Sequence, residues 1–149
     1  MLRYSKDLLQ DIIKKARVAE RKRFIYSLHK SNTELQRLLN AVEPDTYVCP
    51  HKHTHTPEIF IRLRGRVALL TFDDSGEIKD KFILDEENPG AEIPVNTWHS
   101  LVSLDRDSVL YLVMEGPYDE KTHKTFPKWA PRESTEDAIK YLKMLRKRI

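Results

Sequence analysis

Three histidines and one glutamate have the types and the spacing of a metal site. His51 and His53 are one residue apart, Glu58 follows five positions after His53, and His99 lies further along the chain. Side chains alternate along an extended strand, so His51 and His53 share one face. Three imidazoles and a carboxylate suit one divalent first-row metal ion, Fe, Mn, Zn, Ni or Co, and leave coordination positions for water or substrate.

The interval between His53 and Glu58 predicts a turn. In an unbroken strand this odd spacing would place Glu58 on the opposite face, but Pro57 and the threonine-rich stretch before it favour a chain reversal. We therefore expect the next strand to carry Glu58 into the same interior. His55 lies in the expected turn and is interpreted as an exposed loop residue, with a role as an extra or substitute ligand as the alternative.

Other side chains in phase with these residues are candidates for a substrate cavity. Tyr47 and Cys49 alternate in step with His51, although a small buried apolar residue is the other interpretation of Cys49. Arg62 is in phase with Glu58, so its guanidinium could bind a substrate carboxylate or phosphate. The alternative is that Arg62 lies near a strand end and reaches solvent.

Helices are expected before and after a β-rich centre. Apolar residues at helical spacing predict a surface helix over residues 5–18. A second helix is predicted over residues 31–42, where Ser31 and Glu34 form a capping box and Pro44 follows the run. Ser134 or Thr135 would cap a last helix that continues to Ile149.

The segment from Tyr47 to about Gly116 is typical of an all-β sandwich or barrel. Turn signals occur at residues 73–76 and 88–90. The runs between them have strand length and are spaced as in a sandwich or barrel. The predicted strands are residues 59–63, 67–72, 81–84, 98–103 and 109–114.

The motifs resemble those of the cupin superfamily. His51-x-His53, Glu58 and Gly65 reproduce the first cupin motif, and Pro94-x-Asn96-x-x-His99 is similar to the second. More narrowly, the chain resembles the WbuC family of cupin-fold metalloproteins, which occurs among bacterial surface-polysaccharide genes and has no established reaction. That resemblance extends over residues 21–29, 36–39, 47–53, 63–66, 72–74, 97–99, 116–118 and 128–131.

The resemblance implies an all-β double-stranded β-helix, or jelly-roll barrel, with flanking N-terminal and C-terminal helices. It also implies that the metal ligands are His51, His53, Glu58 and His99. His29 and Tyr118 lie in the matching stretches and could cap the mouth of the barrel, although packing is the other interpretation. The second motif usually has glycine where this chain has Asn96, and asparagine tolerates the left-handed turn conformation that a glycine would adopt.

One domain is expected because 149 residues suit a single core. Its expected parts are a helical N-terminal arm over residues 1–44, a cupin barrel over residues 45–116, and a C-terminal coil and helix over residues 117–149. Since cupins are often dimers, the resemblance implies a homodimer.

Composition limits the classes of partner and the cellular location that are expected. The net charge is only +3, and the short basic clusters have no aromatic interleaving, so they are interpreted as solvated helix faces and no nucleic-acid partner is expected. The apolar runs are too short to cross a membrane. A single cysteine and an N-terminus without a secretory signal predict the cytoplasm.

The resemblance implies a metal-binding cupin that acts on a small-molecule ligand, and the place of the WbuC family among surface-polysaccharide genes implies a sugar or sugar nucleotide of bacterial surface-polysaccharide metabolism. Isomerisation, oxygenation and hydrolysis all suit such a site, because the fold alone does not select a chemistry. A non-catalytic binding or sensing protein is the first alternative. A metal-independent sugar-nucleotide epimerase, with a histidine base and a tyrosine acid, is the second.

Overall fold

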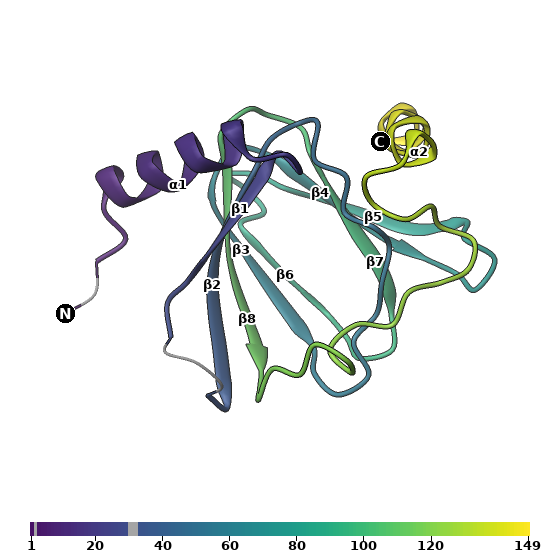
Figure 1. The fold of residues 1–149 in the computed structure, drawn as a ribbon, viewed down its shortest axis with the longest axis horizontal. Coiled ribbons are helices and arrows are strands. Elements are labelled where there is room, and N and C mark those ends of the chain that lie inside the picture. Colours follow the sequence, from purple (N-terminus) through teal and green to yellow (C-terminus); the bar gives the residue numbers. More distant parts are fainter. Residues whose placement is uncertain (2, 30–32) are drawn as a thin grey trace.

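Two antiparallel sheets make up the body of the protein in the computed structural model, which describes residues 1, 3–29 and 33–149 (Figure 1). The larger sheet has the order β1-β2-β8-β3-β6 and the smaller has the order β5-β4-β7. The strands are β1 (Arg23–Ser27), β2 (Leu35–Val42), β3 (Glu58–Arg64), β4 (Val67–Phe72), β5 (Ile78–Leu84), β6 (Gly90–Ile93), β7 (Trp98–Ser103) and β8 (Ser108–Glu115).

The two sheets face each other across an apolar core (Figure 1). Side chains alternate across each strand, so one set of residues from both sheets meets in the interior. The interior cluster contains Val42, Phe60, Leu69, Leu101 and Leu110, all of them buried. This arrangement, with helices at both ends of the chain, is the jelly-roll architecture that the sequence motifs predict.

A helix packs on the outside of each sheet. Helix α1 (Lys6–Val18) begins at the N-cap Ser5 and buries Ile12 and Ile13 against the outer face of the larger sheet. Helix α2 (Glu136–Arg148) begins at the N-cap Thr135 and packs its apolar side on the smaller sheet. Both helices agree with the sequence prediction. In the described part of the chain, neither is long and apolar enough to span a bilayer.

The predicted helix over residues 31–42 is wrong, because residues Leu35–Val42 form strand β2. Strand β2 lies between β1 and β8 and is buried on both faces. Leu39 and Ala41 face helix α1, whereas Leu38 and Val42 face the interior. A strand that is apolar on both faces produces the same spacing as one face of a helix, and tertiary burial overrode the local pattern. Ser31 of the expected capping box lies outside the described residues.

The N-terminal part is therefore not a helical arm over residues 1–44. It is helical over Lys6–Val18, and then contributes β1 and β2 to the larger sheet. The sequence prediction also missed the short strand β6. The other predicted strands are present, with ends that differ by at most three residues.

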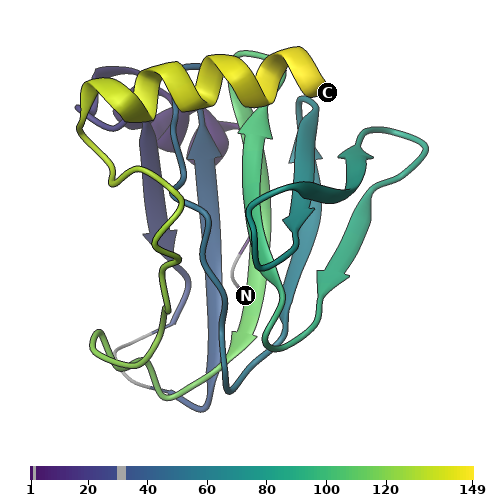
Figure 2. The same cartoon turned by 90° about the vertical axis from the view of Figure 1, so that its right-hand side faces the viewer.

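The chain between β8 and α2 runs along the length of the strands (Figure 2). Two parts of this segment are tied to the barrel, one near its middle and one near its end. Thr125 exchanges two backbone hydrogen bonds with Lys52, each 3.0 Å long. Glu133 accepts hydrogen bonds from the Arg23 guanidinium at 2.7 and 2.8 Å and from Arg21 at 3.1 Å. This C-terminal segment thus covers the side of the barrel next to β1.

Gly65 should be intolerant of a side chain. It has φ of +70° at the end of β3, and an added Cβ would lie 2.9 Å from the Ser108 Cα atom. We expect Gly65→Ala to lower the free energy of unfolding by about 1–3 kcal/mol. Gly90→Ala is the control, because its nearest neighbour is the flexible end of the Ile61 side chain. Urea denaturation of both variants tests this, and equal stability of Gly65→Ala and wild type would contradict it.

The bond between Arg23 and Glu133 should make stability depend on pH. Burial opposes the charge of Glu133, but the nearby Arg23 guanidinium outweighs it and lowers the pKa of the carboxyl. A carboxylate with a lowered folded-state pKa stabilises the protein above its unfolded pKa, near 4.3, and loses that effect as the pH falls through the folded value.

We therefore expect Glu133→Gln to cost about 1–3 kcal/mol at pH 7, because it leaves Arg23 without its anion. The difference between the free energies of unfolding of the variant and the wild type should shrink below about pH 4. Denaturation curves between pH 7 and pH 3 measure this, with the exposed Glu120→Gln as the charge-matched control. A constant difference over that range would show that the carboxylate charge is not the stabilising feature.

Candidate metal centre

The centre is built on a backbone pairing between two histidines. The His51 N–H donates to the His99 carbonyl at 3.0 Å, and the His99 N–H donates to the His51 carbonyl at 2.9 Å. This antiparallel pair adds the 51–52 segment beside β7 of the smaller sheet. Residues that pair directly in this way carry their side chains on the same face. The two rings accordingly lie with their centroids 4.5 Å apart.

His53 joins the same face by strand alternation, as the sequence predicts. Lys52, between the two histidines, points the other way and places its ammonium 4.4 Å from the centre of a Trp98 ring. The His53 carbonyl accepts the Asn96 N–H at 2.7 Å. Asn96 has φ of +60°, the left-handed conformation expected where related motifs have glycine. The turn before β7 is thereby bonded to the histidine segment.

Glu58 reaches the cluster from the opposite sheet. The chain reverses after residue 53, and Glu58 becomes the first residue of β3, paired with Ile93 of β6 and Met114 of β8. Its Oε2 atom lies 3.2 Å from His53 Nε2 and 3.1 Å from His99 Nε2. The turn predicted around Pro57 is thus present, and it brings together groups from both sheets.

All four residues of the centre are buried, with 3–5% of their surface exposed. Their candidate ligand atoms lie within 4.8 Å of one another. Each histidine donates its Nδ1 hydrogen to a backbone carbonyl: His51 to Cys49 at 2.9 Å, His53 to His123 at 2.6 Å and His99 to Thr97 at 2.8 Å. A carbonyl only accepts, so these bonds leave the lone pair on Nε2 of each neutral ring.

This donor set fits a divalent cation. His51 Nε2 is buried and has no hydrogen-bond partner among the described residues. An unprotonated Nε2 and a carboxylate oxygen both accept, so the contacts to Glu58 need a proton or a cation between the atoms. Two ligands about 2.1 Å from one ion, at a right angle, lie about 3.0 Å apart. The separations to Glu58 are close to that value. The carbonyl partners of the Nδ1 atoms match the usual support of metal-bound imidazoles.

The electrostatics keep these groups ready to bind a cation. Burial lowers the pKa of His51 well below its usual range, and the positive charge of Lys124 adds to this effect. Burial opposes ionisation of Glu58, but its contacts with the His53 and His99 rings and the positive charge of Lys124 outweigh it and hold the pKa of the carboxyl well below its usual range. A neutral imidazole and an ionised carboxylate are the forms that bind metal.

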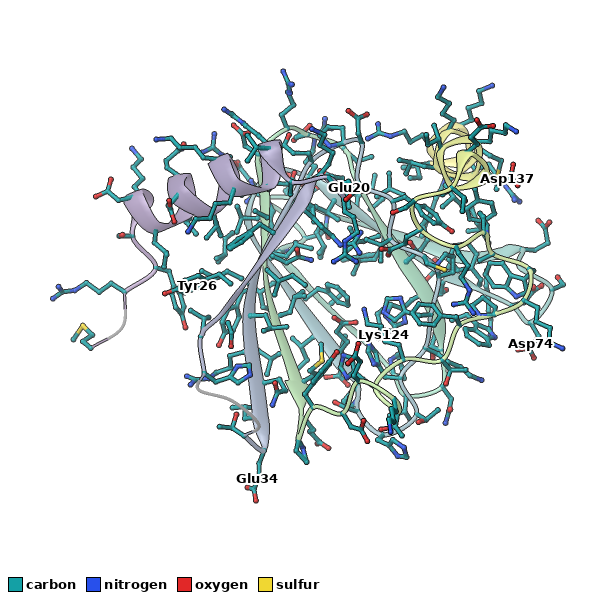
Figure 3. All side chains as sticks on the ribbon, viewed as in Figure 1. Glu20, Tyr26, Glu34, Asp74, Lys124 and Asp137 are labelled. Carbon is teal, nitrogen blue, oxygen red and sulfur yellow. The ribbon has the colours of Figure 1, made fainter. Side chains whose placement is uncertain are left out.

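A pocket of about 290 Å³ adjoins the centre on the side of His51. Its walls come from the start of β1, the 48–51 segment and the C-terminal segment. Figure 3 shows Lys124 at the opening between the two sheets. The side chains that line the pocket are Arg21, Arg23, Val48, Cys49, His51, Lys124, Phe126, Arg132 and Glu133.

Of the predicted cavity residues, only Cys49 lines this pocket. Burial raises the pKa of its thiol, so the group stays protonated and acts as a small wall residue. Tyr47 instead packs beside α2, edge-on to Tyr141, and its hydroxyl donates to the Pro131 carbonyl at 2.8 Å. Alternation alone placed Tyr47 in the cavity, but the hydroxyl is held by the C-terminal segment.

The remaining candidates lie away from the four-residue cluster. Arg62 donates to the Gly65 carbonyl at 2.6 Å, in agreement with the alternative that it lies at a strand end. His29 receives the Arg37 N–H on Nδ1 at 3.0 Å, between β1 and β2. His55 is exposed. Tyr118 is half-exposed and packs against His123 with the two rings tilted by 59°, and the His123 ring in turn lies 4.6 Å from that of His53.

The C-terminal segment contributes to the site, and no sequence pattern predicted this contribution. His123 supports His53 through its carbonyl, and Lys124 and Arg132 supply charge to the pocket. These residues lie in a coil without periodicity, so no pattern connects them to the histidines. The nearest signal was the similarity of residues 128–131 to the WbuC family, which does not include Lys124.

Solved structures with a similar fold are cupin-fold proteins. The capsular polysaccharide assembling protein CapF from Staphylococcus aureus is 18% identical, with a TM-score of 0.62 over 74% of this chain and 30% of that chain. KdgF from Halomonas sp. is 16% identical, with a TM-score of 0.55 over 70% of this chain and 87% of that chain. Oxalate decarboxylase from Lactobacillus farciminis is 12% identical, with a TM-score of 0.53 over 68% of this chain and 30% of that chain.

These likenesses confirm the cupin fold. The chain spans about a third of the length of CapF. No curated protein sequence matches this chain. A family model described as a domain of unknown function, DUF6016, matches residues 4–84 and so includes His51, His53 and Glu58 but not His99. Because that match covers more than half of its residues, this cupin-fold chain belongs to the DUF6016 family.

Proposed function

We propose that this protein is a metal-dependent cupin that acts on a small polar molecule, a sugar or sugar nucleotide of bacterial surface-polysaccharide metabolism. The observation that carries the metal is the convergence of three Nε2 lone pairs and one ionised carboxylate in a buried centre. In this proposal His51, His53, Glu58 and His99 hold one divalent first-row ion.

Two similarities support the sugar class. The motifs resemble the WbuC family, which occurs among surface-polysaccharide genes. CapF, which shares the fold, is described as a capsular polysaccharide assembling protein. The pocket beside His51 has polar walls, as a sugar ligand requires.

The residues around the proposed ion have different roles in this mechanism. When bound, the ion would polarise a substrate oxygen or activate a water molecule. The carbonyls of Cys49, Thr97 and His123 fix the imidazole rings, so the ligand set is held before substrate arrives. Glu58 has a low pKa and therefore serves as an anionic ligand and not as a proton donor at neutral pH. The Cys49 thiol stays protonated, so it is not a nucleophile.

A metal-independent epimerase is less compatible with this arrangement. That mechanism needs a tyrosine hydroxyl facing the substrate beside a histidine base. The Tyr47 hydroxyl donates a hydrogen bond to the Pro131 carbonyl, and Tyr118 contacts the ring of His123; neither tyrosine lines the pocket beside His51. Activity that survives complete chelation would nevertheless favour it over the metal mechanism.

We expect purified, untagged wild-type protein to contain about one equivalent of Fe, Mn, Co, Ni or Zn, and His51→Ala and His99→Ala to lose it. Removing one of four ligands opens the buried centre and leaves the others with unmatched geometry. Elemental analysis measures the metal, and circular dichroism checks the fold of each variant. His55→Ala is the control, because His55 is an exposed histidine of the same segment.

Glu58→Gln provides a second test if an alanine variant does not fold, since it keeps the size of the side chain and removes its charge. In addition, metal at about 100 times its dissociation constant should stabilise the wild type by about 2.7 kcal/mol. Absence of metal from the wild type, even after reconstitution, or equal metal in all variants, would overturn the proposed centre.

The substrate class is tested by turnover. Metal-loaded protein is incubated with sugars, sugar acids, sugar phosphates and sugar nucleotides, under air and under nitrogen, and products are detected by mass spectrometry. We expect turnover of one class, reduced at least about 100-fold in His51→Ala and Glu58→Ala, since even the loss of a residue that only supports a metal ligand typically costs about 10–100-fold. A ligand that raises the melting temperature without any product would instead favour the binding or sensing alternative.

A further inference from the structure

The pocket beside the metal centre has an excess of positive charge. Four cationic side chains line it, those of Arg21, Arg23, Lys124 and Arg132, against the single carboxylate of Glu133. The protein as a whole is nearly balanced, with 26 basic and 23 acidic residues, so this local excess is not a consequence of composition. Such a concave cationic surface attracts anions.

The one carboxylate in the pocket, that of Glu133, already accepts hydrogen bonds from neighbouring residues. Glu133 accepts from the Arg23 guanidinium through both oxygens, from Arg21 at 3.1 Å and from the Cys49 N–H at 3.3 Å. In the described part of the chain, the ion pairs of Glu133 include Arg21 and Arg23, but neither Lys124 nor Arg132 has a carboxylate within 4.0 Å. These two cations of the pocket thus form no direct ion pair, although the Glu58 and Glu133 carboxylates are near enough to interact electrostatically with Lys124.

These two cations are held in place by their surroundings. The backbone next to Lys124 is bonded at Thr125 to Lys52, which lies between two residues of the metal centre. The Arg132 guanidinium lies over the Phe126 ring, 4.9 Å from its centre, and that ring is 6.2 Å from the His51 ring. A rigid platform that carries a guanidinium toward a ligand reduces the entropy lost on binding.

The side of the pocket formed by β1 also faces the barrel interior. Arg23 pairs with Val42 of β2, and directly paired residues share a face. Val42 belongs to the interior core, so Arg23 extends inward over the same space. Its bonds to Glu133 and to the Tyr47 carbonyl, at 2.7 Å, make it a fixed wall. Lys124 and Arg132 remain as the groups free to bind a ligand within the described structure.

We propose that this pocket binds an anionic group, a carboxylate or a phosphate, of a small molecule whose other oxygens reach the metal ion, with Lys124 and Arg132 as the contacting residues. The part that concerns the ion rests on the proposed function. A volume of about 290 Å³ is at the lower end of ligand pockets, which typically measure about 300–1,000 Å³, and therefore suits a molecule of monosaccharide size.

Isothermal titration calorimetry on the metal-loaded protein tests this proposal with three probes that differ in charge: D-glucuronate, D-glucose 6-phosphate and neutral D-glucose. We expect at least one of the two anions to bind about tenfold or more tighter than glucose. Lys124→Met and Arg132→Met should each weaken that binding about tenfold or more, because methionine keeps an unbranched apolar chain and removes the charge. Lys121→Met and Arg106→Met, at exposed positions outside the pocket, are the charge-matched controls and should bind like the wild type.

The two anions distinguish a site for a carboxylate from a site for a phosphate. Binding of glucuronate alone identifies a carboxylate site, and binding of glucose 6-phosphate alone identifies a phosphate site. The proposal is overturned if glucose binds as tightly as both anions, if neither anion binds, or if the pocket variants bind like their controls.

Metal content separates this proposal from the proposed function. All four variants should keep the metal content of the wild type, since none of the substituted residues belongs to the ligand set. If the wild type holds no metal but anion binding still depends on Lys124 and Arg132, the metal mechanism fails and the anion pocket stands. If metal is bound but neither anion binds, the proposed metal centre stands and the proposed anion pocket fails.

Discussion

The paired backbone hydrogen bonds between His51 and His99 are the interaction on which the centre depends. They set a segment without regular strand structure against β7, and so put two imidazoles side by side. Alternation then adds His53, and the bond from Asn96 to the His53 carbonyl limits how far the segment can move. Because three rings must direct lone pairs to one point, a shift of one residue in this pairing would turn His51 and His53 outward.

Local hydrogen bonds and contacts offset the unfavourable burial of a polar cluster inside an apolar barrel. Burying imidazoles and a carboxylate is unfavourable unless their polar atoms are bonded. Each Nδ1 hydrogen finds a carbonyl within the described structure, and Glu58 contacts two rings. The apolar core lies elsewhere between the sheets, and each helix covers an outer face. Stability can therefore come from packing, while the cluster keeps a set of acceptors that only a proton or a cation satisfies.

The C-terminal segment connects this centre to the neighbouring pocket. It supplies the carbonyl that orients His53, and it carries Lys124 and Arg132 into the pocket beside His51. Glu133 fastens its far end to Arg23 on the edge strand β1. One segment thus contributes both to the support of the metal ligands and to the charge of the neighbouring pocket.

The sequence by itself determined the four-residue cluster, the turn that brings in Glu58, both flanking helices and most strands of the barrel. The turn, the helices and the strands follow from local spacing, because alternation and turn residues act over a few positions. The place of His99 in the cluster was implied by the resemblance to the cupin motifs. Only the tertiary structure decided that Leu35–Val42 is a strand, since burial on both faces imitates helical spacing. It also decided that Tyr47 and Arg62 lie outside the pocket while Lys124 and Arg132 line it. Such placements depend on contacts between residues far apart in the chain, which no local pattern records.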